Sequence, residues 1–151
     1  MYGNMDEYYG DLIDNVRHGT GEMKFAASGD RYTGEWRNDL FDGFGTYTWN
    51  TSVSINDKNE QILVVGRRYE GDWKNGKRHG KGIYFVGNGD LYSGEFANGH
   101  YHGKGTLKMT NEDVYTGEWS RGLPHGEVVM TYAKADEKYE GDMEVVSDES
   151  V

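Results

Sequence analysis

Residues 69–82 read Tyr-Glu-Gly-Asp-Trp-Lys-Asn-Gly-Lys-Arg-His-Gly-Lys-Gly, and variants of this stretch recur along almost the whole chain. Its first half, Tyr-x-Gly-x-(large apolar residue), begins at Tyr8, Tyr32, Tyr69, Tyr92, Tyr115 and Tyr139. The steps between successive tyrosines are 24, 37, 23, 23 and 24 residues. Self-similarity at a nearly fixed period is typical of repeat architectures. The sequence therefore predicts an array of repeated units rather than a globular core.

The second half of the unit, His-Gly-x-Gly, begins at His18, His79 and His102, with degenerate copies at Asp42 and His125. Together the two halves resemble the MORN repeat family, whose unit is similar to Tyr-x-Gly-x-Trp-x-x-Gly-x-x-His-Gly-x-Gly. The resemblance covers residues 8–143, as five repeats and the first strand of a sixth. It implies an elongated sheet that serves as an interaction surface.

Each unit has the alternation expected of a β-hairpin. Residues 92–96 alternate at a period of two, which predicts a half-buried strand. Residues 98–99 are types that tolerate positive φ and predict a turn, after which 103–109 alternate again. The predicted fold is all-β, a single-layer, elongated, twisted antiparallel sheet of stacked hairpins. With strands about 4.8 Å apart, each hairpin adds about 10 Å to its length.

The large apolar residues line one face of this predicted sheet, together with recurring glycines. Since glycine weakens a strand, its recurrence beside aromatic rings suggests that a ring lies flat where no side chain stands. A single-layer sheet has no second layer to cover this face. Either the rings cover one another as a thin core, or the face forms a groove for a partner helix or peptide. The candidate partner-binding residues of this aromatic face are Tyr32, Trp36, Tyr69, Trp73, Tyr92, Phe96, Tyr115 and Trp119.

The opposite face carries one acidic residue in every unit. These residues are Asp11, Glu35, Asp72, Glu95, Glu118 and Asp142. In the central units Lys81 and Lys104 stand across the hairpin, so cross-strand Glu–Lys pairs would support the sheet. The simplest interpretation of this row is a solvated charged face. As a binding surface it would take a basic segment, with an affinity that falls as salt rises.

The one step of 37 residues is 14 longer than 23 and places an insertion between residues 50 and 68. Residues 50–55 and 60–66 read as two strands around a polar turn at 56–59. Because a two-stranded ribbon is marginal alone in water, its apolar residues predict a docking contact. Folding back across the sheet, a partner protein and a second copy of the chain are the alternatives. The candidate contact residues of the ribbon are Val53, Ile55, Leu63 and Val65.

Composition excludes several functional classes. The 151 residues contain no cysteine, which excludes thiol nucleophiles, disulfides and cysteine-ligated metals. The net charge of −10 disfavours nucleic acid and anionic lipid, since both favour clustered Lys and Arg. The recurring histidines stand one per hairpin, about 10 Å apart, which is too far for a shared metal ion. The glycines lie inside predicted strands rather than in phosphate-binding loops. We therefore expect no catalytic residues, no metal site and no cofactor.

The resemblance implies a non-catalytic scaffold for protein–protein interaction. It suggests a cytoskeletal, ciliary or flagellar assembly such as a radial spoke, within the cytoplasm. The alternatives are a phosphoinositide-associating module that uses the basic residues of 74–81, and an accessory module of a larger enzyme. Open edge strands also predict a homodimer. Residues 1–7 are expected to end a preceding hairpin, and 144–151 to form an acidic tail.

Overall fold

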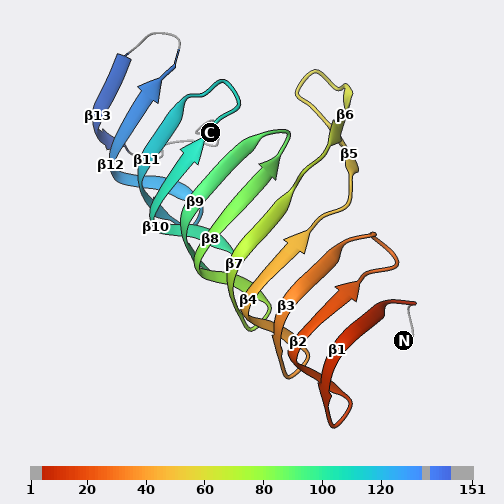
Figure 1. Cartoon of the computed structure of the whole chain (residues 1–151). Coiled ribbons are helices and arrows are strands. Elements are labelled where there is room, and N and C mark those ends of the chain that lie inside the picture. The colour runs from red at the N-terminus through yellow and green to blue at the C-terminus, as the bar shows by residue number, and fades with distance from the viewer. Residues whose placement is uncertain (1–4, 134–136, 144–151) are drawn as a thin grey trace.

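The computed structural model describes residues 5–133 and 137–143, and the chain there forms strands joined by turns and short connections (Figure 1). The strands are β1 (Glu7–Ile13), β2 (Val16–Lys24), β3 (Arg31–Arg37), β4 (Leu40–Thr48), β5 (Ser52–Ile55), β6 (Gln61–Val64), β7 (Arg68–Lys74), β8 (Lys77–Gly87), β9 (Asp90–Ala97), β10 (His100–Lys108), β11 (Val114–Ser120), β12 (Leu123–Tyr132) and β13 (Glu137–Met143). In these described stretches no helix has the length and hydrophobicity needed to cross a membrane. Residues 1–4 of the predicted opening segment and the acidic tail 144–151 lie outside the described residues.

Eleven of the strands form one antiparallel sheet that follows the chain, in the order β1-β2-β3-β4-β7-β8-β9-β10-β11-β12-β13. Figure 1 shows successive hairpins stacked side by side in one elongated, curved layer, with β1 at one end and β13 at the other. β5 and β6 form a separate two-stranded ribbon that projects from this row between β4 and β7. The predicted all-β, single-layer array of hairpins is therefore confirmed.

Tight two-residue turns join the two strands of each hairpin, all at the same end of the strands. Two successive residues have positive φ in each turn: Asp14 and Asn15, Asn38 and Asp39, Asn75 and Gly76, Asn98 and Gly99, and Arg121 and Gly122. This pattern is typical of type I′ turns, whose twist matches that of the flanking strands and which favour Asn, Asp and Gly. The predicted turns are confirmed.

Glycine lies opposite glycine along the middle of the sheet. Gly34 pairs with Gly45 within one hairpin, and Gly45 pairs with Gly71 of the next. The Tyr32 ring lies over Gly45, where a Cβ atom would collide with the ring. The Tyr32 hydroxyl donates to the carbonyl oxygen of Glu35 at 2.7 Å. The same arrangement places Tyr8 over Gly21, Tyr69 over Gly82 and Tyr92 over Gly105. The prediction that these glycines make room for aromatic rings is confirmed.

The second aromatic residue of most units links its hairpin to the preceding one. The indole N–H of Trp36 donates to the carbonyl oxygen of Gly21 at 3.0 Å, and that of Trp73 donates to Gly45 at 3.0 Å. The Tyr32 ring also meets the Trp36 and Trp73 rings edge-on, with centroids 5.1 and 5.6 Å apart. Such aromatic pairs contribute about 0.5–1.5 kcal/mol each beyond the area they bury. Since a tyrosine contacts the tryptophan of its own unit and of the next, the core is continuous along the array.

Each hairpin has a bulge on its return strand, which the sequence analysis did not predict. In the β9–β10 hairpin His102 pairs with Glu95 and Gly105 with Gly94, so residues 103–104 have no partner on β9. Residue 103 is a glycine with a φ of 58°. Bulges commonly use a glycine of positive φ at this place. The two glycines of His-Gly-x-Gly therefore do different work: the first allows the bulge, and the second makes room for the ring.

Gly105→Ala tests the role of the glycine rows. The added Cβ would collide with the ring of Tyr92, which is buried and stacked on Tyr101 with centroids 3.8 Å apart, so the ring has little room to move. We expect urea denaturation to give a free energy of unfolding lower by about 1–3 kcal/mol, the usual cost of overpacking. The control is Ser93→Ala, at an exposed side chain, which should change it by less than about 0.5 kcal/mol. Equal effects of the two substitutions would contradict this role.

Candidate docking surfaces

The structure buries the aromatic residues that the sequence offered as a docking face. These eight side chains are between 0 and 7% exposed: Tyr32, Trp36, Tyr69, Trp73, Tyr92, Phe96, Tyr115 and Trp119. The expectation of an open aromatic groove at these residues is corrected, because the rings lie flat on the glycine rows and cover one another. A partner on this side would touch the outer, partly buried rings instead, among them Tyr47, Trp49 and Tyr101.

The acidic row on the other face has a structural role that the sequence analysis missed. Glu95 Oε2 accepts the backbone N–H of Lys104 at 2.7 Å, and Glu35 Oε2 accepts the equivalent N–H of its unit at 2.5 Å. Asp11 and Asp72 do the same at 3.0 and 3.3 Å. A backbone N–H in a bulge has lost its ladder partner and needs another acceptor. The carboxylates therefore fix the bulges as well as charging the surface.

The Glu–Lys pairs predicted for the central units are wrong. Lys81 lies directly opposite Glu95 in the register, yet within the described residues neither Lys81 nor Lys104 forms an ion pair. Instead, an oxygen of Glu95 is hydrogen-bonded to the backbone of the bulge. Both lysines consequently have ammonium groups that can meet an external ligand.

A groove lies on this charged face along the glycine rows. It consists of two hollows, of about 860 and 570 Å³, that meet at Ser93 and Lys104. Glycines of the paired rows contribute to its floor, and the residues flanking each glycine form its walls. We call it the glycine groove and define it by Phe44, Lys81, Ile83, Glu95, Lys104 and Val129.

The walls of the glycine groove combine apolar groups with negative charge. Phe44 is 57% exposed and Ile83 is 38% exposed. The charged residues that line the two hollows are Glu70, Glu95, Glu118, Glu127, Lys81 and Lys104. Glu70 is paired with Arg68, so three carboxylates against two ammonium groups leave a net negative charge. The groove is therefore complementary to a segment that carries both apolar and basic side chains.

The β5–β6 ribbon has the apolar face that the sequence predicts. Val53 pairs with Leu63, and the alternation of strands places Ile55 on the same side as these two, while Val65 follows the end of β6. All four side chains are between 43 and 62% exposed. The alternative in which the ribbon folds back to bury them against its own sheet is therefore not what the structure shows. A contact with a partner or a second copy stays a prediction.

The residue immediately before His-Gly-x-Gly covers the tyrosine ring of its unit, and the sequence analysis overlooked it. Phe41 and Tyr101 stack on the tyrosines of their units, with centroids 3.9 and 3.8 Å apart. In the third unit Arg78 holds this position, with its guanidinium 5.9 Å from the ring centroid of Tyr69 and 4.6 Å from that of Tyr84 on the return strand. A planar guanidinium can replace a ring here because it also stacks on aromatic faces. The presence of Phe or Tyr in some units and Arg in others at this position was the sequence signal that could have revealed its role.

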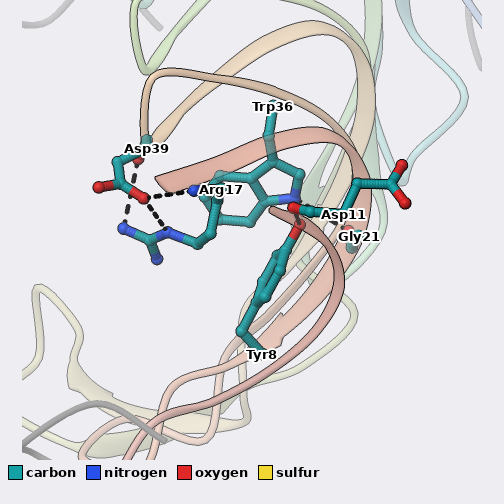
Figure 2. A network of polar contacts seen from close by, with 6 residues as sticks. All are labelled: Tyr8, Asp11, Arg17, Gly21, Trp36 and Asp39. Carbon is teal, nitrogen blue, oxygen red and sulfur yellow. Dashed lines mark hydrogen bonds and ion pairs between the residues drawn. The ribbon is translucent and has the colours of Figure 1, made fainter. Parts of the chain in front are cut away.

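In the first unit this position is Arg17, which links two hairpins (Figure 2). Its guanidinium lies 4.7 Å from the ring centroid of Trp36. Its Nε and its backbone N–H both donate to Asp39 Oδ1 at 2.8 Å. These hydrogen bonds from Arg17 lower the pKa of the Asp39 carboxyl. Asp39 belongs to the next turn, so the contact fixes the spacing of the first two hairpins.

The basic residues of 74–81 are not all on one face of the sheet, although Lys74 lies directly opposite Lys77 in the register. Arg78 lies among the aromatic rings, whereas Lys81 lines the glycine groove on the opposite face. The neighbouring Arg68 is 3.1 Å from a carboxylate oxygen of Glu70. A phosphoinositide headgroup favours several cations on one surface. Within the part of the chain that the structure describes, no three His, Asp or Glu residues are grouped as metal ligands would be.

The fifth unit differs because Val128 stands where the other units have the glycine under the ring. Val128 pairs with Gly117 and is 1% exposed. Among the described residues the hydroxyl of Tyr115 has no hydrogen-bond partner, unlike the tyrosines of the other units. A buried hydroxyl without a partner costs about 1–3 kcal/mol. The fifth unit thus lacks the hydrogen bond from the tyrosine hydroxyl that the other units have.

Burial raises the pKa of the core tyrosines. Desolvation is the main cause for Tyr32, Tyr69 and Tyr92, and nearby carboxylates such as Glu35 act in the same direction on Tyr32. Burial alone raises the pKa of Tyr115 to about 12. All of these side chains therefore stay neutral in the folded protein well above the pH at which a free tyrosine ionises, about 10.

One layer of stacked hairpins, with rings and glycines at equivalent places, defines a β-hairpin repeat protein with exposed grooves along its length. The MORN repeat matches five stretches of the sequence: residues 8–29, 32–52, 69–91, 92–114 and 115–136. The chain therefore belongs to the MORN repeat family, as the Tyr-x-Gly-x-Trp and His-Gly-x-Gly signatures predict.

The chain is also similar to MORN repeat-containing protein 3 of Xenopus laevis, with 36% identity over 82 residues. The matched segment covers 54% of this chain and 31% of that protein. The likeness spans less than a third of the relative, so it supports a repeat-containing protein and assigns no particular activity.

Alkaline titration tests the burial of the tyrosine row. Since the folded state raises these pKa values above the unfolded value of about 10, stability is fully present below that pH and is lost as the pH rises above it. Tyrosinate absorbance from these buried rings should therefore rise together with the loss of near-ultraviolet circular dichroism. Tyr92→Phe should reduce the amplitude of this joint change. Ionisation of most tyrosines before any loss of the dichroism would contradict the buried row.

Proposed function

We propose that this protein is a non-catalytic scaffold that binds a segment of a partner protein along the glycine groove. The observation that supports the proposal most directly is the pair of joined hollows, of about 860 and 570 Å³, on the face opposite the buried rings. Each lies in the range of about 300–1,000 Å³ that ligand sites occupy. A repeated array offers equivalent positions to successive parts of an elongated partner.

The partner segment is apolar and basic. Phe44 and Ile83 provide apolar contacts in the groove, and its glutamates outnumber its lysines. The chain's net charge of −10 accelerates the approach of a positively charged partner. Lys81 and Lys104, which have no internal ion pair among the described residues, can bind carbonyl or carboxylate oxygens of the segment. Their positions would fix the segment's register.

The ribbon is proposed as a second contact with a partner protein. Its exposed apolar face, formed by Val53, Ile55, Leu63 and Val65, is concentrated on a short element that projects from the sheet. Exposed apolar patches of this kind mark interaction sites. The cytoskeletal, ciliary or flagellar setting, the cytoplasmic location and homodimerisation stay predictions from the family resemblance and the open edges. Lipid association has less support, since Arg78 lies among the aromatic rings and Lys81 lies on the other face.

Phe44→Lys tests the glycine groove. The side chain is 57% exposed, so the substitution should leave the fold intact while placing a positive charge where the basic segment lies. Partners retained on the immobilised wild-type chain from a lysate are identified, and their Kd is then measured with purified proteins. We expect the Kd to rise at least about tenfold in Phe44→Lys, and the wild-type Kd to rise with salt.

The matched control for the groove is Leu40→Lys. Leu40 is 46% exposed on the same strand and lines neither hollow of the groove, so it adds the same charge elsewhere. Its Kd should stay within about twofold of the wild-type value. An unchanged Kd in Phe44→Lys, or an equal loss in both variants, would contradict binding in the groove.

The double variant Val53→Lys with Leu63→Lys tests the ribbon. Both residues are exposed, at 62 and 58%, so the charges should be tolerated by the fold. If the ribbon contacts the partner, the Kd should rise about tenfold or more. Ile62→Lys with Glu60→Gln adds the same net charge on the opposite side of the ribbon, outside the hollow at its base, and is the control. A double variant that binds every partner as the wild type does would exclude the ribbon contact.

A further inference from the structure

A hollow of about 610 Å³ opens where the ribbon leaves the sheet. Trp49, Tyr84 and Val86 line it from the sheet, and Val53 and Val64 line it from the ribbon. The sheet residues belong to the same face as the buried rings, because Tyr84 pairs with Tyr69 in the register. This hollow is therefore distinct from the glycine groove, which lies on the opposite face. Its size suits a small ligand or the end of a peptide.

Arg67 is the one cation among the residues that line this hollow in the described part of the chain. Its guanidinium lies 4.2 Å from the ring centroid of Trp49. Its Nε also donates to the hydroxyl of Tyr84 at 2.5 Å. The guanidinium is thus fixed by a stacking contact and a hydrogen bond before any ligand arrives. Such preorganisation reduces the entropy that binding would otherwise cost.

No carboxylate of the described residues forms an ion pair with Arg67. Asp30 lines the same hollow, but both of its oxygens have other partners. Oδ2 accepts the hydroxyl of Tyr47 at 2.7 Å, and Oδ1 accepts the backbone N–H of Asn50 at 2.8 Å. The terminal nitrogens of Arg67 make no hydrogen bond within the described chain, and they are not sealed from solvent. They can bind a carboxylate through two parallel hydrogen bonds.

We propose that this hollow binds the C-terminal carboxylate of a partner peptide whose last residue has an apolar side chain. The carboxylate pairs with the two terminal nitrogens of Arg67. The adjoining side chain packs against Val64 and Val86. An Asp or Glu side chain presents the charge without the apolar body, and inorganic phosphate likewise leaves the valines unused. The site is independent of the glycine groove, since it uses another face and ligand charge of the opposite sign.

The test is a nuclear magnetic resonance titration of the full chain with three small probes. N-acetyl-phenylalanine carries both the carboxylate and the apolar group, its primary amide lacks the charge, and acetate lacks the apolar group. We expect saturable shifts of the Trp49 indole N–H and Arg67 Nε–H signals with N-acetyl-phenylalanine, at a Kd on the order of 1 mM. The amide and acetate should bind at least about tenfold more weakly. Absent shifts, or equal binding of acid and amide, would overturn the proposal.

Variants separate binding from folding. Arg67→Lys keeps the charge but loses the planar fork, and should weaken the acid probe about tenfold. Ser54→Glu places a carboxylate on the exposed rim of the hollow and should abolish binding without disturbing the core, whereas Ser54→Gln should bind like the wild type. Arg37→Gln removes an exposed arginine elsewhere and should change nothing. If both Arg67→Lys and Ser54→Glu bound the acid probe with wild-type affinity, the probe would not lie in this hollow. That result would overturn the assignment.

Discussion

A tyrosine ring lying flat over a glycine of the neighbouring strand is the contact on which this structure depends. A single-layer sheet has no second layer to seal its apolar face, so the rings must cover the backbone and one another. Only glycine leaves the space, as at Gly45 beneath Tyr32, and the hydroxyl then reaches the carbonyl oxygen of Glu35. The tryptophan of the next unit closes the row by donating to the same glycine's carbonyl. This one repeated contact thereby forms a thin core on a sheet that has no second layer.

This solution determines which surfaces are left for partners. The aromatic rings that look most suited to recognition are buried where they cover the sheet. The accessible groove therefore lies on the charged face. There Phe44 and Ile83 stay exposed beside carboxylates that also hold the bulges. The insertion interrupts the regular row of hairpins with a ribbon that has its own hollow at the base. The same chain can therefore offer a regular groove to an elongated partner and one unique hollow to the C-terminus of a peptide.

Much of the fold could be predicted from the sequence because its determinants are local. Alternation at a period of two, turn residues such as Asn98 and Gly99, and the length of the insertion are all readable from neighbouring residues. The bulges could not be predicted, because they arise from hydrogen-bond register between strands. The burial of the aromatic row and the hollow beside Arg67 also depend on contacts between distant residues: Arg67 meets Trp49 because β4 pairs with β7 across the insertion. The role of the acidic row was missed for the same reason.

Hydrogen exchange of the four tryptophan indole N–H groups tests the central claim most directly. The indoles of Trp36, Trp73 and Trp119 donate to glycine carbonyl oxygens of the preceding hairpins at 3.0 to 3.2 Å, whereas that of Trp49 has no such partner within the described chain. If the rings and glycine rows hold the hairpins together, the first three should exchange only through global unfolding, and Trp49 should exchange much faster. Similar fast exchange of all four indoles would contradict the account.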